Sequence, residues 1–216
     1  MEVVLNFLNS FVEVQKFGIN FLTLSFLGTI VFTLFQMISI FRQGRVVWGK
    51  KNGESVSVLQ FGYFAGYLFA LFPYGIMQGS LALIFNSLLG IFCFYVTLGL
   101  WNYKKCVPKY EWALVFLFLM LTAFMFALSA AGKEILFSGL LFGILLFSAH
   151  QLFEITKKKD AGNVSIGVQK AFMASNVFWF FYSLLIGNVP LAIFNPLAFV
   201  INWQIIRSAR KYSRAA

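Results

Sequence analysis

The feature that most constrains the fold is a succession of seven apolar runs. They cover approximately residues 21–41, 56–76, 80–101, 111–131, 134–154, 166–187 and 189–206. Each is close to the roughly 20 residues that a helix needs to cross about 30 Å of hydrocarbon. Because backbone polar groups must be satisfied inside lipid, and the runs lack the alternation of barrel strands, helices are expected. We therefore predict an all-α integral membrane protein with seven transmembrane helices in a single membrane domain, residues 1–216.

The composition excludes an ordinary water-soluble domain. Hydrophobic residues make up 60% of the chain and charged residues 11%, and the mean hydropathy is +0.82. A soluble domain has about 25% charged residues. The 29 phenylalanines are better suited to lipid contact and aromatic packing than to a surface that faces water.

The net charge of +10 comes from basic residues that gather on one side of the predicted topology. Fifteen of the 17 basic residues fall on that side, and only Lys16 and Lys133 fall on the other. The positive-inside rule then predicts a cytoplasmic C-terminus and an outside N-terminus, in a multi-pass protein of the cell membrane. The basic clusters act as orientation signals that are also suited to anionic lipid. No nucleic-acid partner is expected, because the charges are split among short segments.

Two stretches of the chain repeat each other. Gly79-Ser-Leu-Ala-Leu-Ile-Phe-Asn86 is echoed by Gly187-Asn-Val-Pro-Leu-Ala-Ile-Phe-Asn195, and each follows an aromatic helix with a tyrosine near its end, Tyr74 or Tyr182. A shift of 108 residues superposes the tyrosines and glycines, and one added residue near Pro190 makes the shift 109 for the asparagines. We predict two parallel three-helix repeats, 21–101 and 134–207, joined by a linker helix, 111–131, in a 3+1+3 order. Parallel repeats are a known plan of transporters.

This arrangement resembles the SWEET sugar facilitators of the PQ-loop superfamily. The resemblance also rests on Trp179-Phe-Phe-Tyr182, on Asn195 sixteen residues after Trp179, and on the Gly/Ser-bearing loops Gly53–Ser57 and Gly162–Ser165. It implies a sugar uniporter whose pocket lies between the two repeats. Asn86 and Asn195 would then hydrogen-bond sugar hydroxyls, and Trp179 would stack on the sugar ring.

The chain departs from the family pattern at its prolines. Where the superfamily has its Pro-Gln dipeptide, this chain has Phe35-Gln36 and His150-Gln151, and none of its four prolines is at an expected hinge. Rocking of one helix triplet against the other would have to use glycines, such as Gly28, Gly66 and Gly143.

Each candidate substrate-binding residue has a second interpretation. Asn86 and Asn195 either bind solute or tie helices together, since a bare amide in hydrocarbon costs several kcal/mol. Trp179 either stacks on substrate or belongs to an interfacial aromatic belt. Asn176 lies one turn before Trp179 on the same helix face, and either lines the pocket or packs against a neighbouring helix.

Gln36, Gln151, Tyr74 and Tyr182 are candidate gating or structural residues. The two glutamines recur in both repeats, where they brace helix ends or gate the pathway. His150 is the one histidine of the chain, and is either an interfacial group or a proton relay. Before the first run, polar residues such as Glu13 either line a short interfacial helix or belong to a frayed tail.

The distribution of reactive residues gives further expectations. No carboxylate occupies a helix centre, where coupled carriers hold one, so downhill transport is expected. No catalytic constellation is present, so we expect no enzyme activity and no cofactor. Cys93, Cys106 and His150 are scattered, so no metal site is expected.

The alternatives to a sugar facilitator are a transporter of another small solute, such as a vitamin or nucleoside, and a sorting receptor. The sugar and a homo-oligomeric state stay open.

Overall fold

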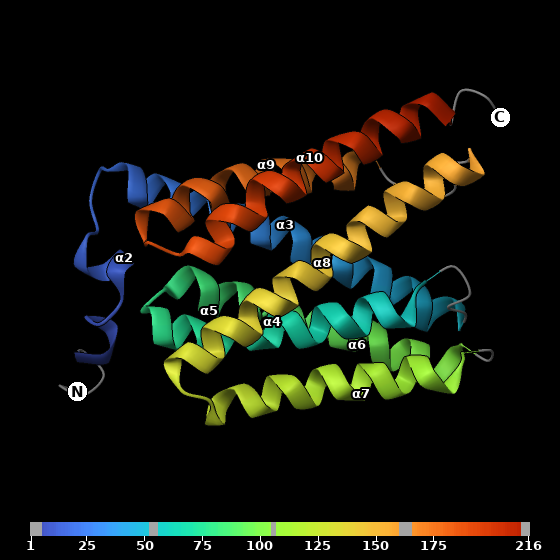
Figure 1. Cartoon of the computed structure of the whole chain (residues 1–216), viewed down its shortest axis with the longest axis horizontal. Helices are drawn as coiled ribbons and strands as arrows, with labels where there is room; N and C mark the ends of the chain where they lie inside the picture. Colours follow the sequence, from blue (N-terminus) through green and yellow to red (C-terminus); the bar gives the residue numbers. More distant parts are fainter. Residues whose placement is uncertain (1–5, 52–55, 105–106, 160–165, 213–216) are drawn as a thin grey trace. The chain divides into compact units, whose positions relative to one another are not determined.

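The computed structural model describes residues 6–51, 56–104, 107–159 and 166–212 (Figure 1). Every longer element in these ranges is a helix: α3 (Phe21–Lys50), α4 (Val58–Gln78), α5 (Leu81–Ser87), α6 (Leu89–Tyr103), α7 (Lys109–Phe124), α8 (Ala130–Lys158), α9 (Ile166–Leu185) and α10 (Val189–Tyr212). A short helix α2 (Val12–Gln15) precedes them, and a 3-10 turn, η1 (Met125–Ala127), follows α7. The seven predicted runs therefore correspond to helices in the same order. The third run consists of two helices, α5 and α6.

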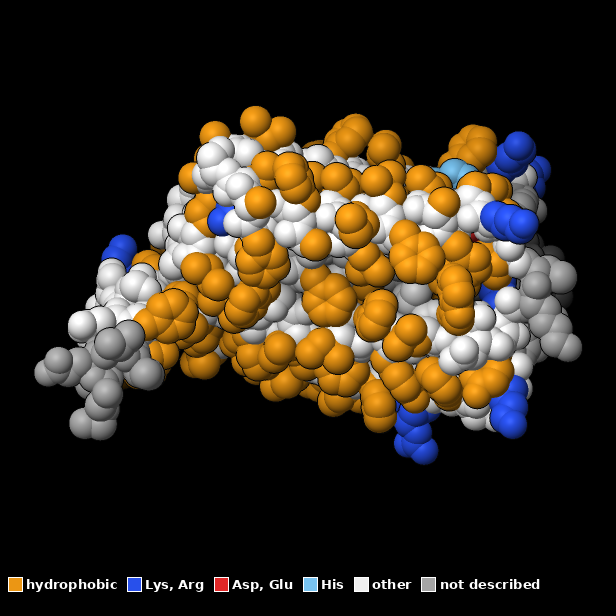
Figure 2. Space-filling view, turned by 90° about the horizontal axis from the view of Figure 1, so that it is seen from below, with side chains coloured by type: hydrophobic (Ala, Val, Ile, Leu, Met, Phe, Trp, Pro, Cys, Tyr) orange, Lys and Arg blue, Asp and Glu red, His pale blue; other side chains and the backbone are white. Residues whose placement is uncertain are grey.

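Five segments of the described chain are long and apolar enough to cross a membrane: Phe21–Lys50, Leu81–Tyr103, Lys109–Ala127, Ala130–Lys157 and Val189–Tyr212. Most of their side chains are not buried in the protein, and hydrophobic groups dominate the face drawn in Figure 2. The chain is a multi-pass membrane protein. The exact number of seven crossings stays a prediction, because α4 and α9 are not among these five segments.

The chain divides into two compact units. The first holds residues 1–17 and 33–137, and the second holds residues 18–32 and 138–216. The division passes through α3 and α8, which are the first helices of the two predicted repeats and the longest in the described chain, at 30 and 29 residues. The predicted repeat boundaries at 21–101, 111–131 and 134–207 therefore differ from the boundaries of the compact units, and the repeat organisation stays a prediction.

In the first unit, α4 is the central helix. It packs against α5, α6 and α7, and twelve of its residues are buried. The approach of α7 is close at Gly66, where a side chain would come within 3.1 Å of Phe118, and the hydroxyl of Thr122 donates a 2.6 Å hydrogen bond to the carbonyl of Gly66. A small residue at the crossing lets two membrane helices approach closely.

Near one end of this unit, a cluster of small apolar side chains forms the core. Its buried members are Val47, Val56, Val58, Val96, Leu100 and Val115. Beside it, the indole of Trp48 stacks on Tyr95 with 5.6 Å between ring centroids and donates to the Tyr95 carbonyl. These contacts fix the last turns of α3 against α6.

In the second unit, α9 and α10 pack along each other, and the first part of α3 packs against α9. Phe178 lies against Phe32 with 5.4 Å between ring centroids, and Phe181 meets Phe21 edge-on at 5.2 Å. Gly28 faces the Phe178 ring so closely that an added Cβ would lie 2.1 Å from it. Gly28 is thus a packing residue in this structure, and its predicted use in rocking is untested.

The turns that precede Asn86 and Asn195 have the same local geometry. Gly79 and Gly187 have φ of 60° and 72°, the left-handed conformation that glycine adopts without steric cost. The next residues, Ser80 and Asn188, each use a side-chain oxygen to accept from a backbone N–H three residues later. Each turn thus ends one helix and caps the next. In the loops before α4 and α9, Ser57 caps α4, while Gly53–Ser55 and Gly162–Ser165 lie outside the described residues.

The segment before α3 differs from both sequence expectations. Glu13 in α2 is buried, and its carboxylate accepts from the Ala82 N–H at 3.0 Å and from the Ser80 hydroxyl at 3.2 Å. The carboxylate therefore lies at the first turn of α5, where unpaired N–H groups favour a negative charge. Glu13 fastens the segment to the first unit, so this part of it is neither a frayed tail nor an exposed polar face.

Candidate functional site

The candidate residues fall into two sets, one in each compact unit. Asn86, Gln36 and Tyr74 belong to the first unit, and Asn176, Trp179, Tyr182, Asn195 and Gln151 belong to the second. The two sets are described separately below.

Asn86 is buried in the last turn of α5. Its side-chain oxygen accepts a 3.1 Å hydrogen bond from the hydroxyl of Thr33, whose own side chain is 1% exposed. That bond uses the amide oxygen and leaves the NH₂ group of Asn86 for another acceptor. The first unit therefore presents a hydrogen-bond donor at this position.

The helix is irregular directly after Asn86. Leu88 separates α5 from α6, and the bonds Leu88 N–H to Phe85 O and Ile91 N–H to Leu88 O run over three residues instead of four. In the second copy, Pro196 follows Asn195 within α10 and has no N–H to give to the preceding turn. Both asparagines thus stand immediately before a local defect in helical hydrogen bonding. Interrupted helices line the substrate sites of many transporters.

Asn195 is also buried, at 2% exposure. Its NH₂ group donates a 2.7 Å hydrogen bond to the carbonyl of Leu191, one turn earlier in α10. The bond uses a donor and leaves the amide oxygen as an acceptor. In the described contacts Asn86 is bonded through its oxygen and Asn195 through its nitrogen, and each amide has further donors and acceptors beyond that bond.

Trp179 and Asn176 lie on α9, in the second unit. The Trp179 side chain is 6% exposed and meets Tyr182 edge-on, with 5.7 Å between ring centroids. This burial is not that of a residue in a lipid-facing aromatic belt. The Asn176 nitrogen Nδ2 is buried and has no hydrogen-bond partner within the described residues. An unpaired buried amide is costly, so a hydrogen-bond acceptor is favoured at this position.

Tyr74 and Tyr182 are both completely buried, as their equivalence predicts. Tyr74 stacks on Phe137 with 3.9 Å between ring centroids, and its hydroxyl donates to the Glu134 carboxylate at 3.2 Å. Gln78 donates to the same carboxylate at 3.3 Å. Tyr74 therefore holds the start of α8 against α4 within the first unit. Gln36 and Gln151 are half-buried, and their gating or bracing role stays a prediction.

Sequence reasoning missed the partner of Asn86. Ser25, Thr29 and Thr33 are all buried and recur every four residues along α3. That spacing places three hydroxyls on one helix face, and it is visible in the sequence. Gln169 was also missed: its side-chain oxygen is buried and has no partner in the described part of the chain. Gln169 lies seven residues, or two helical turns, before Asn176 on the same face of α9.

Cys93, Cys106 and His150 were considered from the sequence as possible metal ligands. The described residues contain no group of three or more His, Cys, Asp or Glu side chains that could hold a metal ion. Cys93 is buried in α6, His150 is exposed on α8, and Cys106 lies outside the described residues.

The structure resembles a known transporter. No protein-family model matches the sequence, and no curated protein matches it either. Among solved structures, the chain is similar to a eukaryotic SWEET transporter, with a TM-score of 0.72 and 12% sequence identity. The match covers 90% of this chain and 97% of the other. That protein is a transporter. The chain therefore has the SWEET fold that its sequence predicts.

Proposed function

We propose that the chain is a membrane facilitator that carries a small polyhydroxylated solute, a mono- or disaccharide, down its concentration gradient. The observation that carries the proposal is the pair of equivalent asparagines, each buried and each bonded through one end of its amide in the described contacts. Asn86 is bonded through its oxygen and Asn195 through its nitrogen. A sugar hydroxyl both donates and accepts, so it is suited to either end of an amide side chain. The SWEET fold supports the same function.

The proposed binding roles are divided between two residue types, asparagine and tryptophan. Asn86 and Asn195 hydrogen-bond the hydroxyls, and Asn176 offers a further donor that has no partner in the described residues. Trp179 presents an aromatic surface to the apolar face of the sugar ring. Gln36, Gln151, Tyr74 and Tyr182 act outside the binding set, as gating or bracing residues.

The uniport mode is supported by the place of the acidic residues. Glu111 lies in the first turn of α7 and Glu134 lies in the second turn of α8. Coupled carriers hold an ionisable residue deeper in the membrane, where it binds the coupling ion. A sorting receptor that binds a charged peptide tail would need comparable charges, so this distribution also favours an uncharged solute.

The experiment is exchange transport by the purified full-length chain in proteoliposomes. Vesicles preloaded with unlabelled glucose, sucrose or a nucleoside are diluted into the same labelled solute, with and without a protonophore. The proposal expects exchange of at least one sugar, with an initial rate that the protonophore leaves unchanged. Exchange of the nucleoside alone would assign the chain to the alternative solute class. Accumulation that collapses with the protonophore would contradict uniport, and absence of exchange by folded protein would contradict transport of this panel.

A further inference from the structure

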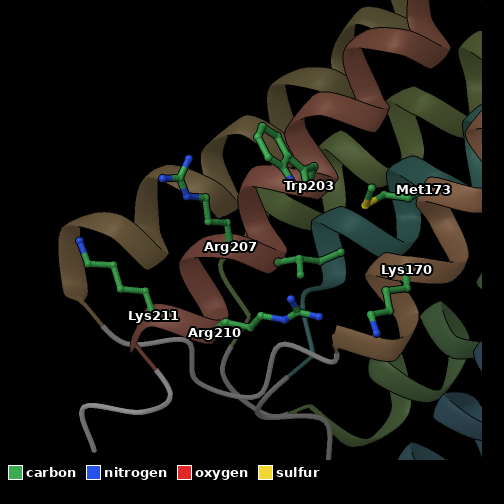
Figure 3. A pocket seen from close by; sticks show the side chains of 7 residues that line it. Lys170, Met173, Trp203, Arg207, Arg210 and Lys211 are labelled. Carbon is green, nitrogen blue, oxygen red and sulfur yellow. The ribbon is translucent and has the colours of Figure 1, made fainter.

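A basic pocket of about 450 Å³ lies between α9 and α10 in the second unit (Figure 3). Lys170 enters it from α9, and Arg207, Arg210 and Lys211 enter it from the last turns of α10. Trp203 and Met173 contribute apolar walls. Figure 3 shows Lys170 and Arg210 reaching toward the same space from the two helices, while Arg207 and Lys211 project from the other side of α10.

The pocket is suited to an anion. None of its lining residues is acidic, so four positive charges share one small volume without a carboxylate in the lining. All four basic side chains are exposed, and their ends are therefore available to a ligand. Several donors on one pocket wall match the oxygens of a phosphate group.

An apolar stripe leads directly to this pocket along α10. The exposed side chains of Val189, Ile193, Leu197, Val200 and Trp203 are spaced by three or four residues, which places them on one helix face. Arg207 continues the same spacing, four residues after Trp203. From Ile193 to Trp203 the helix rises about 15 Å, which is roughly the thickness of one leaflet of the hydrocarbon core.

We propose that this part of α9 and α10 is a binding site for an anionic phospholipid. The phosphate lies between Lys170 and Arg210, Arg207 adds positive charge from the other side of α10, and an acyl chain runs along the stripe from Trp203 toward Ile193. Trp203 stands between the two, where an amphipathic ring prefers to lie at the boundary of hydrocarbon and water. The stripe decides between a lipid and a free phosphate, because a soluble anion makes no use of it. Basic pockets between membrane helices bind lipid headgroups in this way.

Quenching of tryptophan fluorescence by brominated lipid tests the proposal. The full chain is placed in vesicles of equimolar phosphatidylcholine and phosphatidylglycerol, and the bromines are put on the chains of one lipid or of the other. The emission of Trp203 is obtained as the difference from the Trp203→Phe protein. We expect brominated phosphatidylglycerol to quench this emission more strongly than brominated phosphatidylcholine. Added inorganic phosphate at constant ionic strength should leave that preference unchanged.

Two triple variants, each of which removes three positive charges, distinguish binding at this pocket from a general attraction of anionic lipid to basic residues. Lys170→Gln, Arg207→Gln and Arg210→Gln together should remove the preference, with a loss of about fivefold in affinity for each basic side chain. The matched control is Arg42→Gln, Arg45→Gln and Lys50→Gln, which removes three exposed charges from α3 and should keep the preference. Equal loss in both variants, equal quenching by both lipids, or loss of the preference in phosphate would each overturn the lipid site.

Discussion

The hydroxyl of Thr33 donates a 3.1 Å hydrogen bond to the side-chain oxygen of Asn86. The bond joins α3 to α5 within the first unit and sets the direction of the amide. Because the oxygen is occupied, the NH₂ group is what Asn86 can offer to a solute. Thr33 is thus a positioning residue for the proposed binding asparagine.

Thr33→Val should weaken both folding and substrate binding. Valine keeps the shape but removes the donor, so the Asn86 oxygen loses its partner, at a cost of about 1 kcal/mol in the free energy of unfolding. The amide is then free to turn, which should raise the KM of transport more than it lowers kcat. Thermal unfolding and exchange kinetics on the same protein check both effects. Thr97→Val is the control, because Thr97 bonds only to Cys93 of its own helix in the described contacts. An unchanged KM in Thr33→Val would contradict the positioning role.

Replacement of Glu13 should loosen the segment before α3. Its carboxylate accepts from the Ala82 N–H and from the Ser80 hydroxyl at the start of α5. Glu13→Ala removes both bonds and leaves a buried N–H unpaired, so we expect a loss of about 1–3 kcal/mol. Glu13→Gln keeps one acceptor oxygen and should lose less. Protease cleavage before residue 18 should follow the same order. Equal stability of all three proteins would show that the carboxylate does not fasten the segment.

Gly28 and Phe178 should be energetically coupled. Gly28→Ala places a methyl group where the Phe178 ring lies, and overpacking of this kind costs about 1–3 kcal/mol. Phe178→Leu frees space, so the double variant should be more stable than the sum of the single effects predicts. Gly139→Ala is a matched control on α8, because nothing lies within 4 Å of the added carbon, and helix propensity alone should make it slightly stabilising. Additive effects in the Gly28–Phe178 cycle would contradict the packing.

The two cysteines test the orientation. The basic residues predict that Cys106 faces the cytoplasm, whereas Cys93 is buried in α6 and should stay protected. An impermeant thiol reagent should label Cys106 in inside-out vesicles but not in intact cells. Cys106→Ser should abolish the labelling and serves as its control. Labelling of Cys106 in intact cells would reverse the predicted topology.

The sequence predicts the fold because its strongest signals are local. Apolar length predicts each helix, and the repeated sequence marks the two turns at Gly79 and Gly187, which share a left-handed backbone and a helix cap. Helix ends were less well predicted. α3 and α10 continue past their apolar runs to Lys50 and Tyr212, because a helix that leaves the hydrocarbon can go on with charged side chains.

Contacts between residues far apart in the chain could not be predicted from the sequence. The burial of Glu13 at the start of α5 joins residues 69 positions apart, and nothing near Glu13 in the sequence indicates that contact. The bond of Thr33 to Asn86 spans 53 positions. The hydroxyl spacing on α3 predicts a polar face, but it does not predict which helix the face meets.

The most direct test of the proposed function is sugar exchange by Asn86→Ala and Asn195→Ala proteins, measured per folded molecule beside their thermal unfolding. If both amides bind substrate, each variant should unfold near the temperature of the unchanged protein and lose about tenfold or more of its exchange rate. Trp179→Ala should lose a comparable share, and Trp179→Phe should keep part of the rate. Asn102→Ala, an exposed asparagine on α6, should exchange normally. Early unfolding of both asparagine variants with normal exchange per folded molecule would show that the amides only tie helices together, and would contradict the proposed site.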